Sequence, residues 1–343
     1  MDVRLSPEQV ALRDSAAQMM DRLAPATVRD LDDAERRAKL DAAVEAAGWR
    51  DLRTAADGHN HPMASAVEAS IIAEELGRGL ADTPFLGPTL AAELRRLSAA
   101  PPGAERETVL FVPDLSAPAD VSTPRPVAID SQEAASALLL RPMGADRTLV
   151  RLTLGPAGAE IDLTRDLASP DGTAAAEVEA ADRALSGDDL QKWWALGLAL
   201  TCSDLVGVMR GVLRLAGDYA ASRRQYGVPV GSFQAVQHML ADALVAMEGS
   251  RSVALHAAWS VDALPPAEAL VAASTAKAYC ARAARSVCET GIQVHGGIGN
   301  TWDCLAHVFL RRALLSSDIL GGVGANLARV LAHNGIGEGN GLR

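Results

Sequence analysis

Over the first hundred positions, apolar residues recur every three to four residues between polar ones, which is typical of amphipathic helices. Ser6, Pro7 and Gln9 form a helix start, because serine caps free amides and proline suits the first turn. Leu40 and Val44 lie one turn apart before Gly48, a residue that commonly ends helices. Further helices are predicted over 33–47, from a second capping signal at Ser65, and over 89–97.

From Pro101 the pattern changes to short apolar runs separated by proline and glycine. Residues 149–154 alternate apolar and polar side chains, as a half-buried strand does. Strands are predicted over 109–112, 126–129, 137–140 and 149–154. Several short strands at this spacing indicate a small β domain that ends near Asp182.

The remaining pattern is helical again, with much longer periodic stretches. A helix from Ser186 to about Ser222 is apolar on nearly every side, so we expect it at the centre of a bundle. Later helices begin near Phe233, at Pro265 and near Thr301. The predicted fold class is mainly α with a small β domain. Its expected parts are a helical domain (1–99), a β domain (100–184), a four-helix bundle (185–334) and a flexible tail (335–343).

Composition narrows the possible partners and surroundings. The 343 residues include 32 Lys and Arg against 43 Asp and Glu, a net charge of −11, which argues against nucleic acid. The start of the chain lacks the pattern of a signal peptide, and no apolar run is long enough to span a bilayer. We therefore expect a cytoplasmic protein without a membrane partner. Its four cysteines show no zinc spacing and are expected as buried free thiols.

Two segments carry candidate chemistry. Residues 222–234 place two adjacent arginines, an aromatic residue and glutamines at a turn between helices. Arginine guanidinium groups and the unpaired backbone amides at a helix start both bind phosphate well, although a capped helix end would use the same residues. Residues 291–302 place Gln293 before Gly296 and Gly297, where glycine permits close backbone approach. Alone, this second segment is also compatible with a simple helix end.

Together, in this order and at this separation, the two segments resemble the acyl-CoA dehydrogenase family. The stretch 74–84 (EELGRGLADTP) resembles an N-terminal segment of the same family. The resemblance implies an N-terminal helical domain, a middle β domain and a C-terminal four-helix bundle. It also implies FAD shared between neighbouring subunits. The residues implied to bind FAD are Arg223, Gln225, Tyr226, Gln234, Gln293, Gly296 and Gly297.

The family's catalytic carboxylate is missing. A glutamate that removes a proton next to the thioester is expected where this chain has Leu320, or in some members where it has Gly197. Asp318 is a weak substitute, while His295 and Glu248 are better interpreted as structural residues. The β domain also lacks the family's motifs that enclose the flavin ring, so this chain is not expected to bind that ring alone.

This combination resembles the shorter subunit of bacterial α2β2 acyl-CoA dehydrogenases of steroid degradation. The chain is then expected to complete the FAD site of a homologous catalytic subunit that acts on an acyl-CoA, with an electron-transfer flavoprotein as acceptor. Loss of the base is expected to leave an emptied cleft for a bulky acyl group. Two alternatives remain: a homo-oligomeric enzyme with another base or non-redox chemistry, and a scaffold that binds no flavin.

Overall fold

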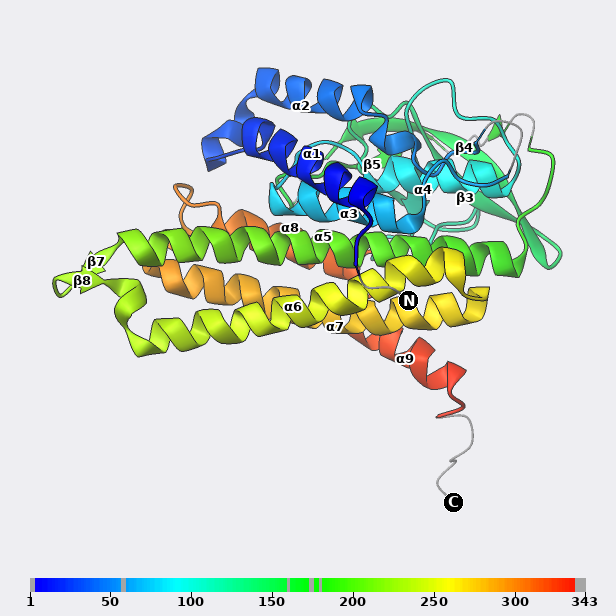
Figure 1. Ribbon diagram of the computed structural model, residues 1–343. Coiled ribbons are helices and arrows are strands. Elements are labelled where there is room, and N and C mark those ends of the chain that lie inside the picture. The colour runs from blue at the N-terminus through cyan, green and yellow to red at the C-terminus, as the bar shows by residue number, and fades with distance from the viewer. Residues whose placement is uncertain (1–3, 57–59, 159–160, 173–175, 179–180, 337–343) are drawn as a thin grey trace.

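The computed structural model describes all residues except 1–3, 57–59, 159–160, 173–175, 179–180 and 337–343. Long helices form a bundle along one side of the molecule, and the N-terminal helices and a β sheet cover it from the other (Figure 1). The N-terminal helices are α1 (Pro7–Leu23), α2 (Ala34–Ala46), α3 (Ala66–Arg78) and α4 (Leu86–Leu97), with short 3₁₀ turns at Val28–Asp32 and Trp49–Asp51.

Helix α5 (Gly187–Ser222) is the central element of the bundle and packs against α3, α6, α7 and α8. Its length and composition would allow it to cross a membrane, but 89% of its most apolar 18-residue stretch is buried inside the protein. The other bundle helices are α6 (Gln234–Ala263), α7 (Pro266–His295), α8 (Ala306–Asp318) and α9 (Val323–His333), with 3₁₀ turns at Val230–Ser232 and Gly296–Asn300.

Six strands form one sheet in the order β3-β1-β2-β5-β4-β6, and a further β3–β4 pairing closes it on itself. Strands β1 and β3 are parallel, whereas the other pairs are antiparallel. The strands are β1 (Glu107–Phe111), β2 (Val127–Ile129), β3 (Ser136–Met143), β4 (Asp146–Ala157), β5 (Leu167–Pro170) and β6 (Ala176–Glu177). The indole of Trp193 on α5 donates to the Leu90 carbonyl at 2.9 Å, which ties the bundle to α4 beneath the sheet.

The fold class, mainly α with a small β domain, is confirmed. Ser6, Ser65 and Ser186 each form a capping box at a helix start, as their sequence contexts predict. The helix predicted over 89–97 begins earlier, at Leu86, because the preceding loop is fixed by Asp130, which accepts from the amides of Phe85 and Gly87. The predicted flexible tail falls mostly on 337–343, which lie outside the described residues.

Candidate functional site

The position expected to hold a catalytic glutamate lies in the turn after α8. Leu320 there adopts a left-handed backbone with φ 62°, and its side chain is fully buried. Its amide donates to the carbonyl of Leu115, in the loop after β1, at 2.7 Å. A Cβ placed on Gly197 of α5 would lie 2.3 Å from Leu320 Cδ1. The two alternative base positions therefore meet in space, and a leucine fills the point of contact.

Buried charges hold this turn in place. The ammonium of Lys277 on α7 donates to the carbonyls of Ser316 and Ile319, the second at 2.9 Å. Burial lowers the pKa of Lys277 to about 8. Asp204 on α5 accepts from the Arg312 guanidinium at 2.6 Å and from the Ser316 hydroxyl at 2.7 Å, which anchors α8 one turn before Leu320.

The two acids considered as replacements for the missing base, Asp318 and Glu248, are both exposed. Asp318 is exposed and lines a cleft of about 420 Å³ between the sheet and α8. Burial raises its pKa, Lys277 opposes that rise, and Asp114 adds to it. Glu248 is exposed on α6. At the base position itself, Leu320 fills the space against Gly197. The expected cleft for a bulky acyl group stays a prediction.

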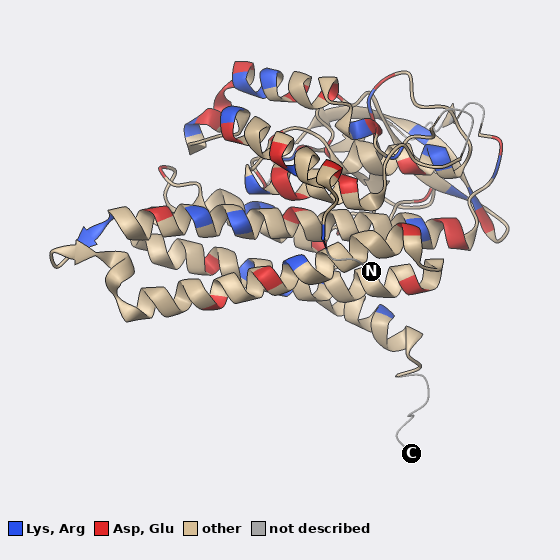
Figure 2. Ribbon diagram, viewed as in Figure 1, with Lys and Arg blue, Asp and Glu red and all other residues tan. Residues whose placement is uncertain are grey.

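The first candidate cofactor segment forms an exposed hairpin at the end of α5. Strands β7 (Arg224–Gln225) and β8 (Val228–Pro229) pair across a turn at Tyr226 and Gly227, both with positive φ. Tyr226 is 94% exposed, and its ring meets Phe233 edge-on at 6.3 Å. Figure 2 shows basic residues on this hairpin, at the far end of the bundle. The predicted phosphate-binding residues thus project from the chain.

The second segment lies at the same end of the bundle, because α7 ends beside the end of α5. The rings of Tyr219 on α5 and His295 on α7 are 4.6 Å apart. Exposed residues lie on both sides of His295 in the sequence: Gln293 precedes it, and Gly296 and Gly297 follow it. The structure therefore brings both sequence-predicted segments to one end of the bundle, where Gln234 also lies exposed at the start of α6.

These exposed groups have few partners within the chain. No hydrogen bond or ion pair joins the Arg223 guanidinium to any residue that the structure describes, whereas Arg224 donates to the Gly227 carbonyl at 3.3 Å. A Cβ on Gly297 would meet nothing within 4 Å, and its φ is not positive, so packing within this chain does not require glycine there. The surface is therefore available to a ligand or to a second chain.

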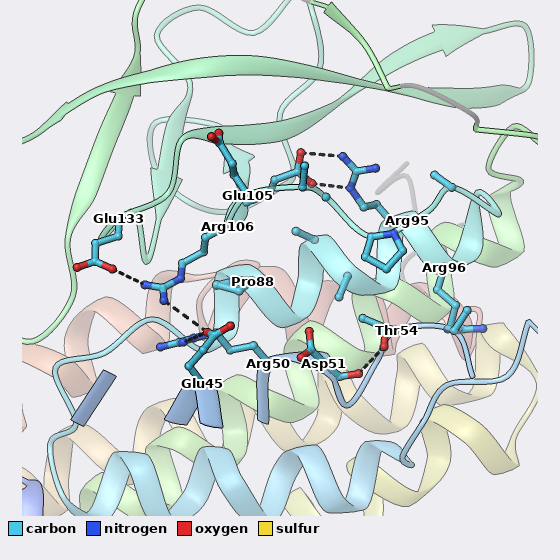
Figure 3. Close-up of a pocket in the computed structure, with 18 residues that line it drawn as sticks. Glu45, Arg50, Asp51, Thr54, Pro88, Arg95, Arg96, Glu105, Arg106 and Glu133 are labelled. Atoms are coloured by element: carbon cyan, nitrogen blue, oxygen red, sulfur yellow. Dashed lines mark hydrogen bonds and ion pairs between the residues drawn. The ribbon is translucent and has the colours of Figure 1, made fainter. Parts of the chain in front are cut away.

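A separate cavity of about 490 Å³ lies beside α4, under residues 100–107 (Figure 3). Its arginines already have acidic partners within the chain: Arg95 pairs with Glu107, and Arg106 with Asp41 at 2.9 Å. Likewise, Arg50 pairs with Asp41, and Arg96 pairs with Glu93. Sequence reasoning missed this cluster because its charges are scattered along the chain without a common spacing. Its satisfied pairs indicate a structural role.

The chain is similar in sequence to several known proteins. The family model for the acyl-CoA dehydrogenase C-terminal domain matches residues 197–335. Acyl-CoA dehydrogenase IpdE2 of Mycobacterium tuberculosis is 33% identical over 253 residues, covering 74% of this chain and 73% of that protein. The chain belongs to the acyl-CoA dehydrogenase family. The IpdE2 protein of Mycolicibacterium smegmatis is 30% identical, covering 77% of this chain and 78% of that protein.

Solved acyl-CoA dehydrogenase structures share the whole fold. The Tcur3481-Tcur3483 steroid ACAD variant superposes with a TM-score of 0.79 at 23% identity, covering 96% of this chain and 98% of that one. The ChsE4-ChsE5 complex from Mycobacterium tuberculosis gives a TM-score of 0.78 at 21% identity, covering 99% of this chain and 100% of that one. At sequence identities of 21% and 23%, the structural similarity establishes a shared fold and no more.

An acyl-CoA dehydrogenase uses FAD, and the residues here fit only part of that cofactor. At the bundle end, a free guanidinium, exposed amides and a glycine backbone open to approach suit an anionic dinucleotide. Beside the sheet, the cleft near Leu320 is lined instead by Asp114, Asp162 and Asp318, and the turn is closed by the Leu320–Leu115 hydrogen bond. Among the described residues that line this cleft, Ser169 has the one side-chain hydroxyl, and there is no arginine, lysine, asparagine or glutamine. The donors found at the bundle end have no counterpart among them.

Proposed function

We propose that this chain is the non-catalytic subunit of a flavin-dependent acyl-CoA dehydrogenase. It completes the FAD site of a homologous partner subunit that carries the catalytic glutamate. The acyl thioester is bound and dehydrogenated at the partner's site. The single observation that carries the proposal is the contrast between a closed base position and an open cofactor-binding end in one chain.

The closed base position supports a division of labour. A base must lie within hydrogen-bond reach of the proton that it removes. At the two places where the family supplies that base, this chain has Leu320 and Gly197, whose packing leaves no room for a substrate carbon between them. Leucine cannot accept a proton, so the chain alone lacks the group that starts the reaction.

The open bundle end supports a shared cofactor site. Exposed aromatic and aliphatic residues surround the polar candidates there, and such residues are enriched where chains associate. They are Tyr226 (94% exposed), Trp302 (62%), Ile298 (43%), Val228 (39%) and Phe233 (36%). An apolar rim around unpaired Arg223 is suited to a second chain that brings its FAD against this surface.

The names of similar proteins suggest the substrate class and the assembly. One structural neighbour is titled a steroid ACAD of two components, and another is titled the ChsE4-ChsE5 complex. By analogy, we infer a steroid-derived acyl-CoA as the substrate of the assembled enzyme and an electron-transfer flavoprotein as its electron acceptor. A cytoplasmic location belongs to the same proposal.

The flavin, when bound, accepts hydride from the β carbon of the thioester. This chain's contribution is binding and orientation. Arg223 and Gln225 would hold the diphosphate, Tyr226 and Gln234 the adenine portion, and the Gln293–Gly297 segment would approach the FAD held mainly by the partner. Each of these contacts raises retention of the cofactor and leaves proton removal to the partner.

Co-expression with a longer family member that retains its glutamate tests this proposal. We expect a stable complex that is yellow with flavin, and this chain alone to be colourless or insoluble. Arg223→Ala in the complex is expected to lower FAD retention about tenfold or more, because a charge-assisted bond to phosphate is lost. FAD is measured by absorbance after gel filtration.

Arg224→Ala is the matched control, since it removes the same charge from the same hairpin but from an arginine used within the turn. Equal FAD loss in both variants would contradict a specific role for Arg223. A yellow homo-oligomer with one FAD per chain would favour the homo-oligomeric enzyme. A stable complex whose FAD content does not change when Arg223 or Gln293 is substituted would favour the scaffold that binds no flavin.

A further inference from the structure

A pocket of about 320 Å³ lies where α3 and α5 meet α1 and α6, and the residues that line it differ from those assigned to FAD. Two buried serines line this pocket: Ser70 on α3 is 6% exposed, and Ser203 on α5 is 4% exposed. Among the residues that the structure describes, neither serine hydroxyl has a hydrogen-bond partner. Buried polar groups normally have partners, so these two hydroxyls need one from outside the chain.

The packing of α3 on α5 brings the two serines to the same level. Two glycines of α5 would clash with α3 carbonyls if they carried a Cβ, in the same order along both helices: Gly207 with Glu74 and Gly211 with Arg78. The two helices therefore pack in a parallel register. One turn earlier on each helix, the same register places Ser203 level with Ser70. The two hydroxyls thus belong to one polar patch on the wall of the pocket.

Most charged side chains of the pocket already have partners within the chain. The ion pairs are Glu74 with Arg210 and Arg251, Glu75 with Arg78 and Arg210, and Arg13 with Asp14. The remaining charged residue of the lining, Glu248, is exposed to water. A charged ligand would have to compete with these ion pairs, whereas an uncharged ligand would leave them intact.

Much of the remaining wall of the pocket is apolar. It is formed by Leu5, Val67, Ile71, Ala254 and Leu255. Pockets for small molecules typically combine an apolar lining with a few polar groups that fix the orientation of the ligand, in volumes of about 300–1,000 Å³. This pocket lies at the lower end of that range, so it is suited to a small ligand.

We propose that this pocket binds a small uncharged amphiphile, whose hydroxyl group bonds to Ser70 and Ser203 and whose apolar part lies along α3 and α6. A hydroxyl both donates and accepts, so one such group can satisfy both serines. The apolar part covers side chains such as Ile71 and Leu255. The inference does not rest on the proposed function, because every residue of the pocket belongs to this chain.

Octan-1-ol is the probe, titrated into the full chain as purified, alone or with its partner, and followed by isothermal titration calorimetry. Octan-1-amine and octanoate carry the same apolar chain with a cationic and an anionic head. We expect saturable binding of octan-1-ol and at least about tenfold weaker binding of both charged compounds, because a charged head loses hydration without gaining a free partner. The proposal is overturned by equal affinity for a charged head, or by no saturable binding of octan-1-ol, the result for a pocket that holds only water.

Serine variants assign the binding to this pocket, including when a partner subunit is present. We expect Ser70→Ala combined with Ser203→Ala to lower the affinity for octan-1-ol about tenfold, because two hydrogen bonds are lost, with unchanged circular dichroism. Ser274→Ala is the matched control: its hydroxyl on α7 is also fully buried without a described partner, but it does not line the pocket, so the affinity should not change. Unchanged affinity in the folded double variant, or an equal loss in the control, contradicts the proposal. If the double variant fails to fold, the two single variants and the comparison of head groups decide.

Discussion

Two regions of this chain, the expected base position and the expected cofactor-binding end of the bundle, differ in burial and in their contacts. At the base position, Leu320 is fully buried against Gly197 and its backbone bonds to the sheet domain. At the bundle end, Arg223 and Gly297 are exposed: the Arg223 guanidinium has no hydrogen bond or ion pair to a described residue, and a Cβ on Gly297 would meet nothing within 4 Å. The first region is closed by contacts within the chain, whereas the second presents unpaired polar groups at the surface. Under the proposed division of labour, a lost function is filled by packing and a shared function leaves a surface open.

The largest effect should follow from restoring a carboxylate in the closed region. Leu320→Glu buries a carboxylate against Gly197. The cations beside this turn, Lys277 and Arg329, already donate to the backbone carbonyls of Ile319 and Leu320, so the new charge lacks a partner of its own and should cost about 3–5 kcal/mol. Urea unfolding measures the change in the free energy of unfolding. Leu320→Met, which conserves volume, is the control and should lose less than about 1.5 kcal/mol. Equal stability of the Glu and Met variants would mean that the site is open to water.

A smaller effect tests the contact between Leu320 and Gly197 itself. Leu320→Ala should cost about 3 kcal/mol through lost burial and a cavity. Gly197→Ala should cost about 1–3 kcal/mol by overpacking, because its Cβ would lie 2.3 Å from Leu320 Cδ1. In the double variant the new methyl enters the vacated space, so we expect favourable coupling of at least about 1 kcal/mol. Additive losses in urea unfolding would show that the two residues do not touch.

Lys277 provides a pH test of the same closed turn. Its pKa in the folded chain, about 8, lies below the ordinary 10.5, so the unfolded chain binds more protons between these values. The free energy of unfolding should therefore rise from about pH 8 to 10.5, by at most about 3 kcal/mol from this group. Only three lysines occur in the chain, which simplifies the alkaline titration. Lys277→Met should remove the rise, and a rise that persists in that variant would assign it elsewhere.

The smallest effect on stability is expected in the open region. Gly297→Ala should change the free energy of unfolding of the isolated chain by less than about 0.5 kcal/mol, since the new Cβ meets nothing within 4 Å. In the co-expressed complex the same change should lower FAD retention, because the backbone can no longer be approached closely. Gly291→Ala is the contrast: its Cβ would lie 2.4 Å from Val212 Cγ2, so it should destabilise the chain itself. If Gly297→Ala and Gly291→Ala changed the free energy of unfolding by the same amount, the distinction between the two regions would fail.

Local signals in the sequence predicted much of the fold. Serine caps at 6, 65 and 186 and the apolar periodicity of α5 are properties of neighbouring residues, and the structure confirms them. The filled base position was not predictable. It depends on a left-handed backbone at Leu320 and on a side chain from α8's end meeting α5, more than a hundred residues away in sequence.

The two cofactor segments were found because each is a compact motif. They lie together because α5 and α7 run parallel, with α6 returning between them, so that both helices end at the same end of the bundle. Their roles in holding FAD remain a prediction. The ion pairs of Asp204 were missed because its partners, Arg165 and Arg312, come from distant parts of the chain, and no spacing in the sequence marks them.

The FAD content of the co-purified complex tests the central claim most directly. Absorbance and native mass spectrometry of this chain with its catalytic partner should give one FAD for each pair of chains, retained with Arg224→Ala and lost with Arg223→Ala. The isolated chain should be colourless. One FAD bound to every copy of this chain in the absence of a partner would contradict the account, because the chain would then complete the whole cofactor site alone.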